Sequence, residues 1–172
     1  TLTMTTMHFR HLLIGAILLG IQAETDALTN LARQQGVYYV YIDDEGEAVM
    51  PKDRKDAAYD LTDGKGRTGG TGAHGNLRIR FDFTAPVSPE RVVVTRWVRK
   101  GKPVSAPIDR FKIYVGDEPG SLPLVTTYDG HSNEYDKHSH DVNIDLPECR
   151  GRYVRVDIEG QGRIAIREVE IL

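Results

Sequence analysis

Hydrophobic and polar residues alternate along much of the chain after residue 37. In residues 76–83 one set of alternate positions is apolar and the other is polar: Leu77, Ile79, Phe81 and Phe83 against Asn76, Arg78, Arg80 and Asp82. Successive side chains of a β-strand point to opposite faces of the sheet. Residues 76–83 are therefore expected to form a strand with one buried face and one wet face.

The same period of two recurs in residues 111–115, 142–146 and 154–158, whereas residues 92–98 are apolar on both faces and predict a central strand. Glycine and proline separate these runs, for example at Gly160 and Gly162, where we expect a turn. Residues 24–35 form the only stretch that could carry a helix. Many short antiparallel strands without alternating helices predict an all-β sandwich.

The last apolar run is irregular. Ile164 and Ile166 share one phase of the alternation, and Val169 and Ile171 share the other. A β-bulge at residues 167–168 explains the slip, and a bulge changes the direction of a side chain. Glu168 is the residue that this bulge is expected to re-aim.

The N-terminal segment differs from the rest of the chain. An uncharged apolar run at residues 12–21 follows Arg10 and precedes small residues, which is typical of a signal peptide. We expect residues 1–23 to be this signal, with Met4 or Met7 as the true start and residues 24–172 as one domain. Ala27 is the second choice of cleavage site. The alternatives are a retained membrane anchor and a buried strand.

Charge and cysteine content narrow the function classes. Without residues 1–23 the chain has 21 basic and 25 acidic residues, a formal charge of −4, so no overall charge attracts nucleic acid. Cys149 is the only cysteine, which excludes an intrachain disulfide and favours a half-buried, unreactive thiol. We expect a secreted or periplasmic protein that is not inserted in the membrane after cleavage.

The stretch DGKGRTGGTG at residues 63–72 contains the spacing G-x-G-x-x-G. A dinucleotide site needs a helix directly after such a loop, but here residues 76–83 follow as a strand. No Gly-Lys-Ser or Gly-Lys-Thr is present, so a P-loop is excluded as well. The acid Asp63, the hydroxyl of Thr68 and turned-in carbonyls are oxygen ligands that suit Ca²⁺. The alternative is a solvated turn in which Asp63 caps a backbone N–H.

Four parts of the chain occur in the order of one known family. They are NLAR at residues 30–33, LTDG at 61–64, RFKIYVGD at 110–117, and the ending GRYVRV at 151–156 with IREVEI at 166–171. Together they resemble discoidin domains, also called coagulation factor type C domains. These belong to the galactose-binding-like superfamily, which includes the family 32 carbohydrate-binding modules. The resemblance covers residues 30–172.

This resemblance implies a jelly-roll β-sandwich of about eight antiparallel strands with its termini close together. It also implies a protein that binds rather than reacts. Family members often hold a structural Ca²⁺, and the matching positions here are Asp63, Thr68 and Glu168. The chain departs from the family at Lys65, where an acid or amide is common, and at Gly70, near the usual position of a tryptophan. No organic cofactor is implied.

Two segments carry residue types that suit a sugar. Sugar recognition needs an aromatic face together with hydrogen-bonding groups. The first segment contains Arg96, Trp97 and Arg99, followed by Lys100 and Lys102. Trp97 is in phase with Val93 and Thr95, so the alternative is that it packs on the sandwich.

The second segment is the loop at residues 128–141, in which His131, Asn133 and Tyr135 are the candidate sugar contacts. Its pair His138 and His140 also has a spacing seen in zinc and copper sites. The third ligand of such a site is undetermined among His131, Asp136 and Asp141. A solvated polar loop is the alternative to both.

These observations predict a secreted, non-catalytic module that binds carbohydrate or another cell-surface ligand, with one structural Ca²⁺. An alternative is an accessory N-terminal domain of a longer exported glycoside hydrolase or sulfatase. A further alternative is a metal-dependent enzyme that uses the loop from His131 to Asp141.

Overall fold

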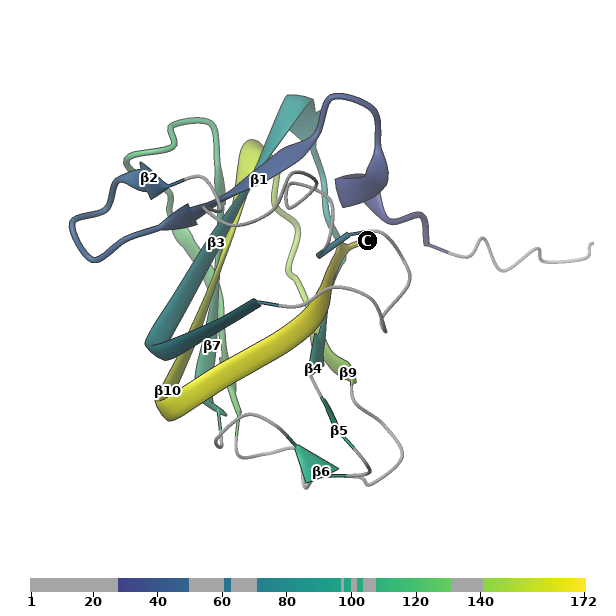
Figure 1. The fold of residues 1–172 in the computed structure, drawn as a ribbon. Coiled ribbons are helices and arrows are strands. Elements are labelled where there is room, and N and C mark those ends of the chain that lie inside the picture. Colours follow the sequence, from purple (N-terminus) through teal and green to yellow (C-terminus); the bar gives the residue numbers. More distant parts are fainter. Residues whose placement is uncertain are drawn as a thin grey trace, which may run out of the picture.

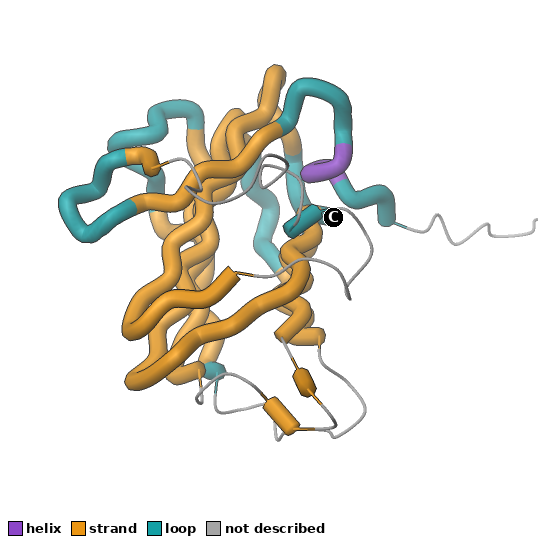
Figure 2. The backbone as a smooth tube through the Cα atoms, in the orientation of Figure 1, coloured by secondary structure: helices purple, strands orange, loops and turns teal. Residues whose placement is uncertain are grey.

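The structure is a computed structural model that describes residues 28–49, 61–62, 71–96, 98–99, 102–103, 108–130 and 141–172. Strands make up most of this part of the chain, and its only helix is the short 3-10 turn η1 (Leu31–Arg33) (Figure 2). None of the helical structure in these ranges is long and apolar enough to cross a membrane. The predicted signal at residues 1–23 lies outside the described residues.

One antiparallel sheet of eight strands makes up the fold. Its strands are β1 (Tyr38–Ile42), β2 (Ala48–Val49), β3 (Thr71–Val87), β4 (Arg91–Arg96), β7 (Ile108–Gly116), β8 (Leu124–Asp129), β9 (Asp141–Asp145) and β10 (Gly151–Ile171). The order is β2-β1-β3-β10-β4-β9, and β7 pairs with β10 and β8. β5 (Val98–Arg99) and β6 (Lys102–Pro103) form a separate hairpin. The all-β antiparallel prediction is confirmed.

β3 and β10 run side by side and bend together, which folds the sheet into two layers (Figure 1). The first half of β10 lies between β3 and β7, and its second half pairs with β4. The first layer contains this first half of β10 with β3, β1, β2, β7 and β8, and the second layer contains the second half of β10 with β4 and β9. At the bend, residues 160–162 of β10 face the single residue Gly75 of β3, whose φ of +82° favours glycine. The turn expected at Gly160 and Gly162 is therefore wrong, because these glycines form a corner inside one long strand.

The core lies between the two layers. Phe81, Ile113 and Val156 contribute from the first layer, and Val94 and Ile166 from the second, all without exposed surface. The first three are apolar positions of the predicted alternation, Val94 lies in the predicted central strand, and Ile166 lies in the last apolar run. Burying one such side chain contributes about 1.5–3 kcal/mol to the free energy of unfolding.

The polar face of β3 differs from the prediction at one position. Asp82 belongs to the expected wet face but is only 6% exposed. The guanidinium of Arg80 reaches along the strand and donates to both carboxylate oxygens, with Nε–Oδ1 at 2.7 Å and Nη2–Oδ2 at 2.9 Å. Asp82 is therefore a paired, covered carboxylate rather than a solvated one.

The predicted bulge in the last strand is present. Ile166 of β10 pairs with Arg96 of β4, and Glu168 pairs with the adjacent residue Thr95, so Arg167 is the extra residue. Beyond Ile166, β3 no longer covers the other edge of β10. The backbone of Leu61 occupies that edge, because Val169 N donates to Leu61 O at 2.7 Å.

The first described residues lie beside the last strand (Figure 1). The side-chain oxygen of Asn30 accepts hydrogen bonds from Ala32 N, which caps η1, and from Ile171 N, both at 3.1 Å. This agrees with the proximity of the two ends of the domain that the family resemblance implies.

Cys149 is a free, half-buried thiol, as expected. Its sulfur lies 3.7 Å from the carbonyl oxygen of Pro89. Burial raises the pKa of this thiol, which lowers the fraction of reactive thiolate at neutral pH.

Candidate functional site

The two candidate ligand loops start and end next to each other. One loop leaves β4 after Arg96 and returns at the start of β7, and the other leaves β8 and returns at the start of β9. Thr95 of β4 pairs with Asp141 of β9, and the Thr95 hydroxyl donates to Asp141 Oδ1 at 2.7 Å. At the opposite ends of the loops, Gly130 N donates to Asp109 O at 3.0 Å. The two loops are thus held together at both ends.

A glycine is required at the second of these contacts. A Cβ atom added to Gly130 would overlap the carbonyl oxygen of Ile108, which is backbone and cannot turn aside. The absence of a side chain at Gly130 lets the end of β8 approach the start of β7 closely. This approach sets the separation of the two loops.

The first loop carries the hairpin of β5 and β6, in which Val98 pairs with Pro103 and Arg99 pairs with Lys102. Of its candidate residues, Arg96 is the last residue of β4. It is 5% exposed and pairs with Ile166 of β10. The backbone of Arg99 lies in β5. Trp97 and the side chain of Arg99 are not among the parts that the structure describes, so their roles in sugar binding stay predictions.

The second loop includes His131, Asn133 and Tyr135, which all lie outside the described residues, as do His138 and His140. Their proposed sugar and metal contacts therefore stay predictions. What the structure describes are the two residues that flank this loop, Gly130 and Asp141, and both are in contact with the ends of the first loop.

The candidate calcium ligand Glu168 lies close to the same end of the molecule. It faces Thr95 across β10 and β4, and its side chain is buried, with the residue 4% exposed. Leu61, whose carbonyl binds the N–H of the next residue in β10, is followed by Thr62, which is also buried. Asp63 and Thr68 themselves lie outside the described residues.

Glu170, two residues after Glu168 in β10, is influenced by two other acids. The pKa of Glu170 is raised, chiefly by burial and then by the negative charges of Glu168 and Asp141, while Arg33 acts in the opposite direction. In the part of the chain that the structure describes, no group of three or more His, Cys, Asp or Glu side chains is placed to hold a metal ion. The described residues therefore supply one candidate ligand, the carboxylate of Glu168, and the other candidate ligands, Asp63 and Thr68, lie outside them.

Sequence reasoning missed Thr95 and Asp141 as the residues that bring the two loops together. Each stands at the edge of a candidate loop, but nothing in the local pattern indicates that these two residues, 46 positions apart, pair there. The available signal was a hydroxyl within one predicted strand, Thr95, and an acid just before another, Asp141.

Comparison with solved structures identifies the fold. No protein-family model matches the chain, and a search of curated proteins finds no relative. Among solved structures, the module CpGH89CBM32-6 of Clostridium perfringens has a TM-score of 0.60 at 15% identity, over 84% of this chain and 98% of that one.

Two further structures agree with it. A chitosan-binding module derived from a chitosanase/glucanase of Paenibacillus sp. IK-5 has a TM-score of 0.56 at 16% identity, over 84% of this chain and 99% of that one. CpGH89CBM32-5 of C. perfringens, solved with GalNAc-β-1,3-galactose, has a TM-score of 0.54 at 9% identity, over 67% and 82%. The chain has the β-sandwich fold of family 32 carbohydrate-binding modules, as the sequence resemblance predicted. At these identities the likeness is one of fold.

Proposed function

We propose that the chain is a non-catalytic module that binds carbohydrate through the two loops at residues 97–107 and 131–140. The observation that carries the proposal is the double contact between these loops, Thr95 with Asp141 and Gly130 with Asp109. It brings together the ends of two loops whose sequences contain one tryptophan, one tyrosine and several basic and histidine residues. The similarity in fold to carbohydrate-binding modules supports this function.

The residue types fit sugar recognition. The rings of Trp97 and Tyr135 would pack against the C–H face of a pyranose, while Arg99, His131 and Asn133 would hydrogen-bond its hydroxyls. Arg96 is buried at the base of the first loop, where it would position the loop rather than contact the sugar directly. Binding of this kind needs no bond to be broken, in keeping with a module without catalysis.

A glycan array tests the proposal. Purified residues 24–172 are applied to a broad panel of neutral and acidic glycans, and affinities for the strongest ligands are then measured by calorimetry. Trp97→Ala and Tyr135→Ala are each expected to weaken binding about tenfold or more, the loss typical of a central aromatic contact. Leu124→Ala, which removes a 52% exposed apolar side chain from β8, is the control and should bind like the parent.

The module would also carry one structural Ca²⁺, held by Asp63, Thr68 and Glu168. Support comes from the burial of Glu168, from the neighbouring acid Glu170, whose pKa the charge of Glu168 helps to raise, and from the contact of Leu61 with Val169 two residues before Asp63. A cation there would offset the cost of a buried carboxylate and fix the glycine-rich loop to β10.

Thermal unfolding in calcium and in chelator tests the ion. The parent is expected to melt several degrees higher in calcium, because a ligand that binds only the folded state stabilises it. Asp63→Ala and Glu168→Ala should lose this difference, and the exposed control Glu148→Ala should keep it. Equal melting temperatures of the parent in both buffers would remove calcium from the account.

The second candidate function is that of an accessory domain in a longer exported enzyme, a glycoside hydrolase or a sulfatase. The Paenibacillus module of similar fold derives from a chitosanase/glucanase, which favours this arrangement. Both versions place the protein in the secreted or periplasmic space after removal of residues 1–23. N-terminal sequencing of the exported protein should give Glu24 as the first residue, and the gene beyond Leu172 decides between a free module and an enzyme domain.

A further inference from the structure

A second surface with sugar-binding chemistry lies on the outer face of the first layer, away from the two loops. Side chains on this face follow the pairing of β1, β3, β10 and β7. One row across the strands is Tyr38, Asp82, Tyr153 and Gly116, and the next is Val40, Arg80, Arg155 and Tyr114. We call Tyr38, Arg80, Tyr114, Tyr153 and Arg155 the Arg–Tyr face.

Two arginines stand directly opposite each other at its centre. Arg80 of β3 and Arg155 of β10 are paired residues. Like charges at paired positions of an antiparallel sheet are destabilising, so this doublet needs compensation. In each strand an aspartate two residues after the arginine compensates the positive charge. Asp82 accepts hydrogen bonds from Arg80, and Oδ1 of Asp157 lies 3.0 Å from Nε of Arg155.

Each arginine is also stacked on a tyrosine of a neighbouring strand. The guanidinium carbon of Arg155 lies 3.9 Å from the ring centre of Tyr114, and that of Arg80 lies 5.3 Å from the ring centre of Tyr153. Stacking over an aromatic ring holds a guanidinium in a fixed plane. The doublet is therefore ordered before any ligand binds.

The acids lie beneath the arginines. The side chains of Asp82 and Asp157 are 8% and 9% exposed, whereas those of Arg80 and Arg155 are 14% and 23% exposed. Within the described residues, Arg80 Nη1 and both Nη atoms of Arg155 make no hydrogen bond to the protein. The centre of the face thus presents N–H donors to the solvent and keeps its carboxylates covered.

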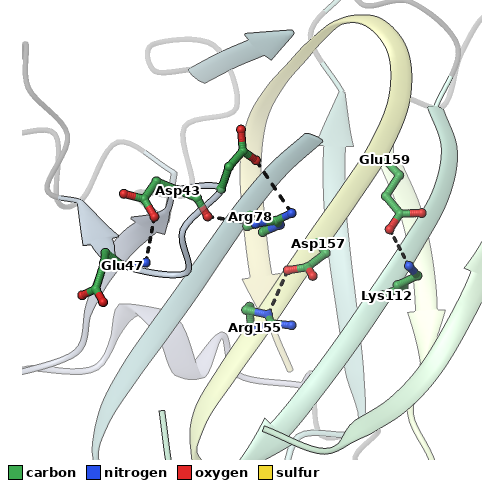
Figure 3. A network of polar contacts seen from close by, with 8 residues as sticks. Asp43, Glu47, Arg78, Lys112, Arg155, Asp157 and Glu159 are labelled. Atoms are coloured by element: carbon green, nitrogen blue, oxygen red, sulfur yellow. Dashed lines mark hydrogen bonds and ion pairs between the residues drawn. The ribbon is translucent and has the colours of Figure 1, made fainter. Parts of the chain in front are cut away.

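The two cations nearest the doublet, Arg78 and Lys112, are engaged by neighbouring groups (Figure 3). Arg78 donates to Asp43 O at 2.8 Å and lies 3.8 Å from Asp44, and Lys112 Nζ lies 2.5 Å from Glu159 Oε1. These pairs border the doublet on β3 and on β7. At the centre of the face Arg80 and Arg155 keep donors to spare, and the exposed Arg110 of β7 adds a further positive charge beyond Lys112.

We propose that the Arg–Tyr face binds an acidic polysaccharide, with a uronate carboxylate at the Arg80–Arg155 doublet and neighbouring sugar rings against the tyrosines. A guanidinium offers paired N–H groups that match a carboxylate. Tyr38 on β1 and Tyr114 on β7 are separated by three strand spacings, about 14 Å, which is longer than one sugar ring. This extent fits a chain rather than a single sugar. The surface is separate from the loop site and shares with it only the class of ligand.

Calorimetric titration with oligogalacturonate and oligomannuronate tests this proposal on residues 24–172. The neutral comparison is the methyl ester of the same oligogalacturonate. We expect the acid form to bind at least tenfold more tightly than the ester, since hydrogen bonds between charged groups are the stronger ones. Arg80→Lys and Arg155→Lys keep the positive charge and the pairing with Asp82 and Asp157 but lose the planar fork. Each should weaken binding of the acid form about tenfold.

Two control variants distinguish uronate binding at this face from binding elsewhere on the module. Arg91→Lys alters an exposed arginine paired with Asp145 on the other layer, and it should leave binding unchanged. Trp97→Ala alters the loop site and should also leave uronate binding at the Arg–Tyr face unchanged. If Trp97→Ala has no effect on any glycan, the loop proposal fails while this one stands.

Several results would overturn the proposal. Parent-like affinity of both lysine variants would show that the doublet does not contact the ligand. If neither uronate oligomer binds the parent, acidic polysaccharide is the wrong class of ligand for this face. Tighter binding of a single-stranded oligonucleotide than of either uronate would reassign the face to nucleic acid.

Discussion

Single residues connect distant parts of this fold, and Asn30 is the clearest case. Its side-chain oxygen accepts from Ala32 N and from Ile171 N, so one amide joins the cap of η1 to the end of β10. Asn30→Ala is expected to lower the free energy of unfolding by about 1–2 kcal/mol, the cost of losing such a cap. Urea unfolding measures the change. Asn76→Ala, at an exposed position of β3, is the control, and equal losses in both variants would contradict the role of Asn30.

Asp157 gives a prediction on pH dependence. Its pKa is raised, chiefly by burial, although the charges of Arg155 and Arg78 act in the opposite direction and Glu159 adds to the rise. Lys112, its neighbour on β7, is engaged by Glu159. The folded state therefore holds the proton of Asp157 more firmly than the unfolded chain does. The protonated form of Asp157 therefore stabilises the folded state. This stabilisation is lost as the pH rises above about 4, the usual pKa of an aspartate, and through the raised pKa of the folded state.

The test compares the parent with Asp157→Asn, which cannot ionise. The free energy of unfolding of the parent, relative to this variant, should fall as pH rises above about 4. Urea unfolding at a series of pH values gives the difference. A difference that grows with pH would mean that the arginines outweigh burial at this site.

At the scale of elements, the close approach of β7 and β8 determines how far apart one pair of ends of the two candidate loops lies. Gly130→Ala would place a methyl group against Ile108 O and force the strand ends apart. We expect a loss of about 1–3 kcal/mol in the free energy of unfolding, together with weaker glycan binding. Gly120→Ala meets no atom within 4 Å and should change stability by less than about 0.5 kcal/mol. Parent-like stability of Gly130→Ala would contradict the tight contact.

The elements also show what a sequence pattern can predict. The alternation in residues 76–83 and the slip near Glu168 each follow from the period of two, because a strand must keep its apolar side chains on the core side. The strand and the bulge were therefore predictable. The corner at Gly75 and Gly160 was not, since glycines that end a strand and glycines that bend one look alike along the chain. Only the pairing of β3 with β10 on both sides of the bend distinguishes them.

The candidate sites, too, could be predicted from the sequence only in part. The types of residue suited to a sugar or an ion could be chosen from the loops, and the bulge that aims Glu168 could be inferred from the slip in phase. The pairing of Thr95 with Asp141 could not, because it depends on which distant strands become neighbours. The Arg–Tyr face was hidden for the same reason. Its signal, an arginine two residues before an aspartate in both β3 and β10, has meaning only once the two strands are paired.

The whole molecule has two separate candidate binding surfaces. The end of the sandwich carries the loops that follow β4 and β8, and the outer face of the first layer carries the Arg–Tyr face. A module with both could hold a polysaccharide chain along the sheet while the loops bind a separate sugar unit. Binding at two sites of one chain increases the overall affinity beyond that of either site.

Titration of ¹⁵N-labelled residues 24–172 with the strongest neutral ligand of the glycan array, followed by NMR, tests the central claim most directly. The account predicts that shifted amides at saturation concentrate in residues 97–107 and 131–140 and at their anchors, Thr95, Asp109, Gly130 and Asp141. Amides of β1 and β2 should stay in place. Saturation without any shift in the two loops would contradict the account.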